Sequence, residues 1–455
     1  MDGGTSRRPA AAGTVVAWSL YELGATGFAM NLLSLHFPLD VATRVPRGNE
    51  KFSVVFGLSM VAVALTAPVL GALADVHGKR RFLVPSVLLG AALTALVAAP
   101  APIGVTLLVF ALANVAFQSA YVFYNAVLPD VSDARTEGRV SGWGVAAGYV
   151  GSLLAMFVAL PFVSGEIRAK LPFVLASVVD AFSVAAVSSN ENAPWARVNA
   201  YLPTALLWLA AAIPLLFFAR LPRPNRTAAF PSPHSKKPRE LSPFRAVLAT
   251  VRSLSSTPSI LWFLVGCFLL FDVIHTVQIQ MSTYSKFAVG MSDGEVQVFL
   301  LLCTAVAVVG GLLYGFLCQK VSIRTATIVA LLNWALVFAL ALLVRDHRLF
   351  LGVGALAGIG LGGVKVTSRL GLIALVPAER TTEFFGFFAL AGEAASVTGP
   401  LLWAATLALF PDRSPLGYRA GLGVLFAVLA ASILAFRKVR FPSRPGSEPT
   451  GRGPV

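Results

Sequence analysis

The chain alternates between long apolar runs and short polar stretches. A helix needs about 20 mostly apolar residues to cross a lipid bilayer. Runs of that length predict twelve spans in two sets of six: 14–40, 52–75, 82–99, 103–128, 142–163 and 198–219, followed by 258–281, 295–317, 323–344, 349–375, 382–410 and 418–436. We therefore expect an all-α membrane protein of two six-helix bundles.

One further apolar run, residues 171–189, is interrupted by Asp180. If this run crossed the bilayer, the cation-rich segment after the sixth span would face the same side as the charge-balanced outer loops. That segment contains Arg223, Arg226, Lys236, Lys237, Arg239, Arg245 and Arg252. Because cations that flank spans stay on the cytoplasmic side, we interpret 171–189 as a re-entrant or extracytoplasmic element.

The apolar runs and the cations between them divide the chain into four parts. We expect an N-terminal six-helix bundle at 1–220, a cytoplasmic linker at 221–257, a C-terminal six-helix bundle at 258–440 and a disordered tail at 441–455. The linker is rich in Pro, Arg, Lys and Ser, which is typical of a flexible connection. An even number of spans places both termini in the cytoplasm.

Composition supports a membrane location. Of the residues, 56% are hydrophobic and 13% are charged, whereas soluble domains contain roughly 25% charged residues. The net charge of +15 comes from cations at span ends and in the linker, which is the distribution that membrane orientation requires. We expect no nucleic-acid partner, because no basic aromatic domain is present. The first apolar run is too long for a signal-peptide core.

No motif in the sequence indicates an enzyme. Cys267, Cys303 and Cys318 all lie in apolar runs and are interpreted as core residues, so we expect no metal site and no disulfide. Residues 358–363 match the nucleotide-binding pattern G-x-G-x-x-G, but they lie within an apolar span, where close helix packing is the better interpretation. We expect no cofactor.

Polar residues inside four spans fall on single helix faces. They lie in spans one, four, seven and ten, at spacings of three and four residues that place side chains on one face. Since charged groups at membrane depth cost several kcal/mol, such faces predict a shared cavity. The candidate substrate or proton residues are Glu22, Thr26, Gln118, Tyr121, Asn125, Asp272, His275, Thr276, Lys365 and Arg369.

Four of these residues also have simpler interpretations. Arg369 can extend its side chain to the membrane surface. Asp272 and Lys365 can form a structural ion pair between helices. Glu22 can be a solvated acid near a helix start, where the helix dipole favours it.

The loop between spans two and three reads Gly-Ala-Leu-Ala-Asp-Val-His-Gly-Lys-Arg-Arg over residues 71–81. Its three consecutive cations predict a short cytoplasmic connection. We expect a gating role for Gly71, Asp75, Gly78, Arg80, Arg139 and Glu393. The alternative for Asp75 and Arg80 is that they only set the orientation of the chain in the membrane. Glu393 is expected to join the two halves as a latch, and the alternative is that it has no such role.

This loop resembles the signature G-x-L-x-D-x-x-G-[RK]-[RK] of the major facilitator transporters. Further stretches are similar to one branch, the vacuolar amino-acid effluxer family linked to autophagy, together with its bacterial relatives. They are residues 18–22, 123–130, 138–144, 148–151, 362–363, 368–369, Pro377 and 383–386, and the similarity extends from about Trp18 to Leu434. The resemblance implies the major facilitator fold and amino-acid efflux.

Several cavity positions depart from the family pattern. Glu22 stands where the family has Asp, His275 stands where it has Gln, and Lys365 also replaces Gln. The second copy of the signature loop has decayed to Gly315-Phe-Leu-Cys-Gln319 and lacks its acid. The resemblance therefore implies the fold more strongly than the substrate.

We expect a secondary active transporter that works by alternating access and exports amino acids, basic or neutral. Proton coupling is a hypothesis motivated by Glu22, Asp272 and His275. Two alternatives stay open: an exporter of another small solute such as a drug, sugar or organic anion, and a membrane sensor or scaffold that does not transport. We expect a monomer in the cytoplasmic (inner) membrane rather than the vacuolar one.

Overall fold

The computed structural model describes residues 12–131, 137–184, 196–218, 258–376 and 381–441. The described chain is helical and contains no strand. The expected linker at 221–257 lies outside the described residues, as does the expected tail apart from Phe441.

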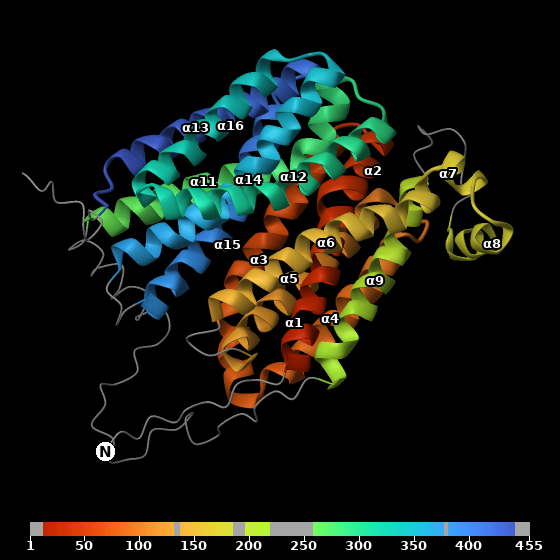
Figure 1. The fold of residues 1–455 in the computed structure, drawn as a ribbon. Helices are drawn as coiled ribbons and strands as arrows, with labels where there is room; N and C mark the ends of the chain where they lie inside the picture. Colours follow the sequence, from red (N-terminus) through yellow and green to blue (C-terminus); the bar gives the residue numbers. More distant parts are fainter. Residues whose placement is uncertain (1–11, 132–136, 185–195, 219–257, 377–380, 442–455) are drawn as a thin grey trace, which may run out of the picture.

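The first half forms one group of helices (Figure 1). Its long segments are α1 (Ala12–Phe28) with η1 (Ala29–Leu35) and α2 (His36–Arg44), α3 (Gly48–His77), α4 (Lys79–Val97), α5 (Ile103–Val131), α6 (Glu137–Val163), and η2 (Ala196–Ala200) with α9 (Tyr201–Ile213) and η3 (Pro214–Phe218). Between α6 and η2 lie two short helices, α7 (Gly165–Ala169) and α8 (Phe173–Phe182).

The second half forms the other group, drawn in green to blue in Figure 1. Its helices are α11 (Pro258–Tyr284) with η4 (Ser285–Val289), α12 (Asp293–Lys320), α13 (Ile323–Leu343), α14 (His347–Leu375), α15 (Thr381–Leu407) and α16 (Pro415–Arg437).

Within the described residues, ten helical segments are long and apolar enough to cross a membrane. The chain is therefore an all-α multi-pass membrane protein. The expected spans at 14–40 and 382–410 correspond to α1 with its extensions and to α15, neither of which is among the ten. The count of twelve therefore stays a prediction.

Short polar connections define where several helices begin. The hydroxyl of Ser292 accepts a hydrogen bond from the Glu295 backbone N–H, and the Glu295 carboxylate accepts one from the Ser292 N–H, which forms a capping box at the start of α12. The hydroxyls of Ser322 and Ser414 cap α13 and α16 in the simpler way. These caps satisfy backbone donors that would otherwise be unpaired at the helix start.

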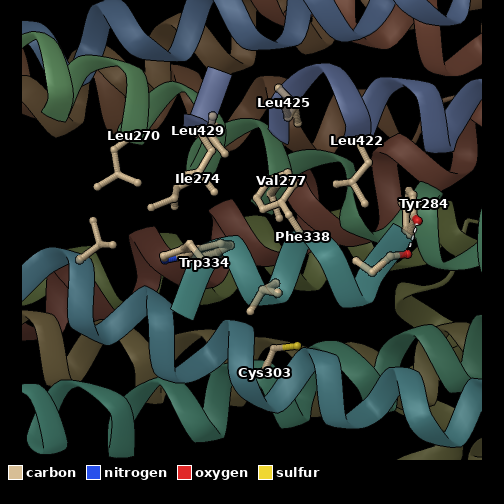
Figure 2. Close-up of a cluster of buried hydrophobic side chains, with 14 of the residues drawn as sticks. Leu270, Ile274, Val277, Tyr284, Cys303, Trp334, Phe338, Leu422, Leu425 and Leu429 are labelled. Atoms are coloured by element: carbon tan, nitrogen blue, oxygen red, sulfur yellow. Dashed lines mark hydrogen bonds between the residues drawn. The ribbon is translucent and has the colours of Figure 1, made fainter. Parts of the chain in front are cut away.

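Each half has its own buried core. In the first half, the ring centroids of Phe28 and Phe117 are 4.2 Å apart in a stacked pair, next to the buried Trp208. In the second half, Leu270, Trp334 and Leu425 belong to one buried cluster (Figure 2). The second-half cluster also includes Leu35, Leu39 and Met156 of the first half, so the two cores meet at the interface.

Glycines allow the closest helix contacts. A Cβ on Gly151 of α6 would lie 1.9 Å from the carbonyl oxygen of Leu23 in α1. A Cβ on Gly362 of α14 would lie 2.2 Å from the Gly311 nitrogen in α12. Because no side chain fits these gaps, glycine sets the helix spacing. The expectation that the glycine run at 358–363 serves helix packing is confirmed.

Candidate functional site

A cavity of about 370 Å³ lies between the two halves. Its polar lining includes residues of α1, η1, α5 and α6 of the first half and of α11, α12, α14 and α15 of the second. Six of the ten candidate residues line it: Glu22, Thr26, Gln118, Tyr121, His275 and Lys365. The polar faces of spans one, four, seven and ten therefore do meet at one chamber.

The acid of this cavity is Glu22 of α1. Its side chain is buried, and its Oε1 accepts a hydrogen bond of 2.8 Å from the Tyr121 hydroxyl of α5. Its Oε2 has no hydrogen-bond partner among the described residues. One oxygen of the carboxyl group is thus fixed, and the other is buried without a partner in the described part of the chain.

Thr26 lines the cavity but its hydroxyl also serves helix packing. Its Oγ1 lies 2.6 Å from the Gly148 carbonyl oxygen of α6 and 2.8 Å from the Glu22 carbonyl oxygen. The threonine therefore joins α1 to α6 just beside the Glu22 carboxyl group.

The cation of the cavity is Lys365 of α14. Its Nζ lies 5.0 Å from the ring centroid of Tyr149, which belongs to α6 in the other half. An ammonium group over an aromatic face is attracted by the ring quadrupole. Lys365 therefore reaches toward the first half, and its charge acts on Glu22 and on His275.

His275 of α11 also lines the cavity, together with Glu22 and Lys365. Its Nδ1 lies 2.9 Å from the Ser396 hydroxyl of α15, and its ring stacks against Phe271. The second half thus contributes both an imidazole and an ammonium group to the cavity.

Four candidate residues are not among the lining residues: Asn125, Asp272, Thr276 and Arg369. Asp272 is buried against α15, where its Oδ1 accepts hydrogen bonds from the Thr398 hydroxyl (2.5 Å) and the Gly399 N–H (2.6 Å). Thr276 donates to the Asp272 carbonyl oxygen. Asp272 therefore joins α11 to α15, and no ion pair with Lys365 occurs among the described residues.

The sequence reasoning missed several lining residues. Gln278 lies three residues after His275 on the same face of α11, so helical spacing alone could have identified it as a lining residue. The aromatic residues Phe299, Trp334 and Phe350 line the second-half side of the cavity. No sequence signal separates such aromatics from ordinary core residues.

Of the expected gating residues, the structure describes Gly78 and Arg80 fully. Gly78 ends α3 with a φ of 97°, in the region where glycine is favoured. Arg80 is exposed at the start of α4. Gly71, Asp75, Arg139 and Glu393 lie within α3, α6 and α15, and the surroundings of their side chains lie outside the described part of the structure.

A buried polar cluster joins the halves at the end where α3 begins. The side-chain amide of Asn49 donates to Gln280 Oε1 (2.9 Å) and to the Thr283 hydroxyl (3.0 Å), both on α11. Gln280 in turn donates to Ser53 of α3 (2.7 Å), and Trp403 of α15 donates to Asn49 Oδ1 (2.8 Å). We call these five residues the polar lock.

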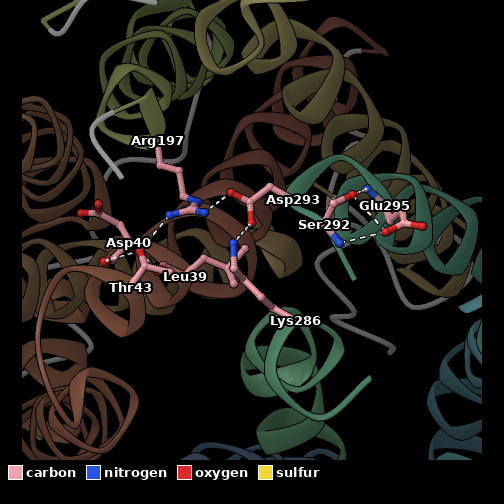
Figure 3. A network of polar contacts seen from close by, with 8 residues as sticks. All are labelled: Leu39, Asp40, Thr43, Arg197, Lys286, Ser292, Asp293 and Glu295. Carbon is pink, nitrogen blue, oxygen red and sulfur yellow. Dashed lines mark hydrogen bonds and ion pairs between the residues drawn. The ribbon is translucent and has the colours of Figure 1, made fainter. Parts of the chain in front are cut away.

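Charged contacts join the halves at the same end (Figure 3). Arg197 of η2 forms an ion pair with Asp293 at the start of α12, and Lys286 of η4 binds the other oxygen of Asp293. Arg413 donates hydrogen bonds to the carbonyl oxygens of Ala42 (3.0 Å) and Thr43 (2.9 Å). This end of the interface is therefore closed.

Comparison with protein families gives one match over most of the chain. A model described as "Vacuole effluxer Atg22 like" matches residues 52–439. The chain is 26% identical over 430 residues to an uncharacterized MFS-type transporter, YxiO, of Bacillus subtilis (strain 168), covering 92% of this chain and 94% of that protein. It is 29% identical over 191 residues to autophagy-related protein 22 of Eremothecium gossypii, covering 39% of this chain and 36% of that protein.

Solved structures share the fold. A bacterial homolog of the human lysosomal transporter Spinster, in an inward-facing and unoccupied conformation, gives a TM-score of 0.67 at 14% identity and covers 94% of this chain and 95% of its own. The nucleoside transporter NupG gives a TM-score of 0.64 at 13% identity and covers 94% of this chain and 100% of its own.

Proposed function

Because the chain belongs to the Atg22-like vacuole effluxer family and has the fold of major facilitator transporters, we propose that it exports amino acids by alternating access. The family and fold make it a membrane transporter and not an enzyme. The amino-acid substrate, the direction and the coupling ion are the proposal.

The cavity is the observation that carries this proposal. It places a carboxyl group, Glu22, on the first half and an ammonium group, Lys365, on the second. An amino acid carries the complementary pair of charges, so its ammonium group can bind Glu22 while its carboxylate binds Lys365. A volume of about 370 Å³ is within the range of small-molecule pockets. One solute can thus draw the two halves together.

The polar lock supports alternating access. At about 1.5 Å per residue, the 30 residues of α3 place Asn49 and Gly78 near opposite ends of one membrane-crossing helix. The cations that follow Gly78 mark the cytoplasmic side, so we assign the lock to the extracytoplasmic side. Export requires that the halves separate there, and the lock must then break.

Proton coupling involves Glu22 in this proposal. Glu22 lines the cavity that the solute occupies, and its buried Oε2 has no hydrogen-bond partner among the described residues, so a proton and the substrate ammonium group compete for one carboxyl group. Asp272 is not assigned this role, because its Oδ1 is already held by two donors from α15. His275 is a further titratable group of the cavity.

A flux assay in proteoliposomes tests the proposal. Vesicles that contain the full-length protein are loaded with a mixture of labelled amino acids, with and without a pH gradient. We expect efflux that the gradient accelerates, loss of that acceleration in Glu22→Gln, and loss of most efflux in Lys365→Gln. Asp272→Asn is the matched carboxylate control, and it should keep the response to the gradient if it folds. Efflux from Glu22→Gln that still follows the gradient contradicts the coupling.

A second candidate is export of another small solute with a planar or apolar group. The observation that favours it is the aromatic wall of Phe299, Trp334 and Phe350. One structural neighbour is a nucleoside transporter, although the likeness extends to the fold alone. Competition by a panel of nucleosides, organic anions and amino acids separates the candidates, because only solutes of the true class reduce efflux of the label.

A further inference from the structure

A second cavity, of about 390 Å³, lies at the same end as the polar lock. Residues of η1, α2, α6, α7 and η2 line it from the first half, and residues of α12 line it from the second. It shares no lining residue with the central cavity. It is therefore a separate chamber that spans the interface of the halves.

The charged cluster beside this chamber carries a surplus of positive charge. Arg197 and Lys286 both bind Asp293, and Arg44 binds Asp40. The cluster thus contains three cationic side chains and two acidic ones. At the cavity wall, Glu166 is paired with Lys170, so this second pair leaves the surplus unchanged.

The chamber also contains a buried polar group without a partner. His36 lines the cavity and is only 3% exposed, and its Nε2 has no hydrogen-bond partner among the described residues. The buried Arg197 lines the same cavity, and its planar guanidinium group suits a carboxylate. Burying an unpartnered polar group is unfavourable unless a ligand completes it.

The remaining walls are mostly aliphatic, with Ser164 and Gln297 as neutral polar residues. The aliphatic residues include Leu35, Leu39, Leu160, Val163, Val298 and Leu301. A chamber with cationic and imidazole groups among aliphatic walls matches a ligand that has an anionic head and an apolar body. Water or a bare inorganic anion would leave the aliphatic walls without contacts.

We propose that this chamber binds a small aliphatic carboxylate, with the carboxylate held by Arg197 and His36 and the tail held by the leucine and valine side chains. The bound carboxylate competes with Asp293 for Arg197 and so weakens the ion pair that joins the halves. The ligand is either a free carboxylate of the extracytoplasmic solution or the carboxylate end of an exported amino acid. Only this second source rests on the proposed function.

Ligand-induced shifts in thermal unfolding test the binding without any transport. The full-length protein in detergent is titrated with pentanoate, with norvaline, which adds only an α-ammonium group, and with the neutral pentanamide, at constant ionic strength set with chloride. A ligand that binds only the folded state raises the unfolding temperature as its concentration increases. We expect a saturable shift with pentanoate or norvaline and none with pentanamide.

Variants that are expected to weaken the apparent affinity and one that is expected to strengthen it together separate loss of binding from misfolding. His36→Leu and Arg197→Lys should each weaken the apparent affinity at least tenfold. Glu166→Gln removes an acid from the cavity wall and should strengthen it two- to threefold, a gain that a damaged protein does not give. A shift in pentanoate alone identifies a free carboxylate as the ligand, and a stronger shift in norvaline identifies the exported solute.

Lys365→Gln distinguishes this chamber from the central cavity. If the shift survives Lys365→Gln and is lost in His36→Leu, the carboxylate binds in the second chamber even if no amino acid is ever transported. A shift that disappears in Lys365→Gln and persists in His36→Leu places the ligand in the central cavity and overturns the proposal. So does an equal shift with pentanamide, or no shift with either carboxylate.

Discussion

At the scale of single residues, Glu22 and Asp272 show how two acids in polar helix faces reach different surroundings. Both were candidates for the cavity because each lies on a polar face of a span. Among the described residues, one oxygen of Glu22 is buried without a hydrogen-bond partner at the cavity wall, whereas Asp272 points into α15, where two donors hold it. Spacing along a helix predicts which residues share a face, but not which neighbouring helix that face meets.

Glu22 also gives a direct prediction about Tyr121. Tyr121→Phe removes the hydroxyl that fixes Oε1 of Glu22. Because hydrogen bonds to charged groups contribute about 1.5–3 kcal/mol, we expect the apparent affinity for substrate to fall about tenfold, with efflux still responsive to the pH gradient. Rates of efflux at varied internal substrate concentrations measure this affinity. An unchanged affinity would show that Tyr121 does not position the acid.

The glycines predict a stability difference. Gly151→Ala would place a Cβ against the Leu23 carbonyl oxygen, whereas Gly423→Ala in α16 would meet no atom within 4 Å. Overpacking costs about 1–3 kcal/mol, while alanine in an open helix position is neutral or gains up to about 1 kcal/mol. We expect the unfolding temperature to fall in Gly151→Ala and to stay or rise in Gly423→Ala. Equal shifts in the two variants would contradict the close contact of α1 and α6.

At the scale of elements, the apolar runs predicted nearly every long helix. Runs such as 323–344 and 103–128 match α13 (Ile323–Leu343) and α5 (Ile103–Val131) closely. The predicted run 14–40 covers α1, η1 and the start of α2, but the sequence did not predict that η1 and α2 form one wall of the second chamber. Tertiary contacts set those details, and a hydropathy pattern does not encode them.

The short helix α8 lies within residues 171–189, the run that we expect to be a re-entrant or extracytoplasmic element. At about 1.5 Å per residue, its 10 residues are too short to cross a bilayer. Val174, Val178 and Phe182 recur every four residues and are exposed, whereas Asp180 is held by Arg168 of α7. An amphipathic helix of this kind is suited to lie in the membrane interface.

We therefore expect α8 to lie on the extracytoplasmic surface of the bilayer with its apolar face in the lipid. An environment-sensitive fluorophore on Val178→Cys should emit at shorter wavelength in vesicles and be quenched by lipid-borne quenchers. The same label on Asp180→Cys, which lies about 160° around the helix from Val178, should report water. Identical spectra at the two positions would mean that α8 does not lie in the interface.

At the scale of the whole molecule, two separately packed halves meet through a central cavity and a closed end. The polar lock uses neutral groups, and four of their hydrogen bonds join the two halves. Breaking it exposes amides and hydroxyls to water, which can replace the lost bonds at a small net cost of about 0.5–1.5 kcal/mol each. Such a lock holds the halves firmly and still permits them to separate.

The lock predicts the effect of Asn49→Leu. This substitution removes three of the hydrogen bonds that join α3 to α11 and α15. It leaves Gln280 and Thr283 without one partner in the closed state, so we expect the population open to the extracytoplasmic side to rise several-fold. Labelling of Ser152→Cys, a cavity position, by an impermeant thiol reagent added outside measures that population. Thr66→Leu, at an exposed position of α3, is the control and should leave the labelling unchanged.

The central claim is that the cavity containing Glu22 and Lys365 opens to each side of the membrane in turn. It is tested most directly with Ser152→Cys in a protein whose native Cys267, Cys303 and Cys318 are replaced by alanine, labelled by an impermeant reagent from each side of oriented vesicles. We predict labelling from both sides and protection from both by a transported amino acid. Labelling from one side only under all conditions, or labelling that no solute reduces, would contradict alternating access through this cavity.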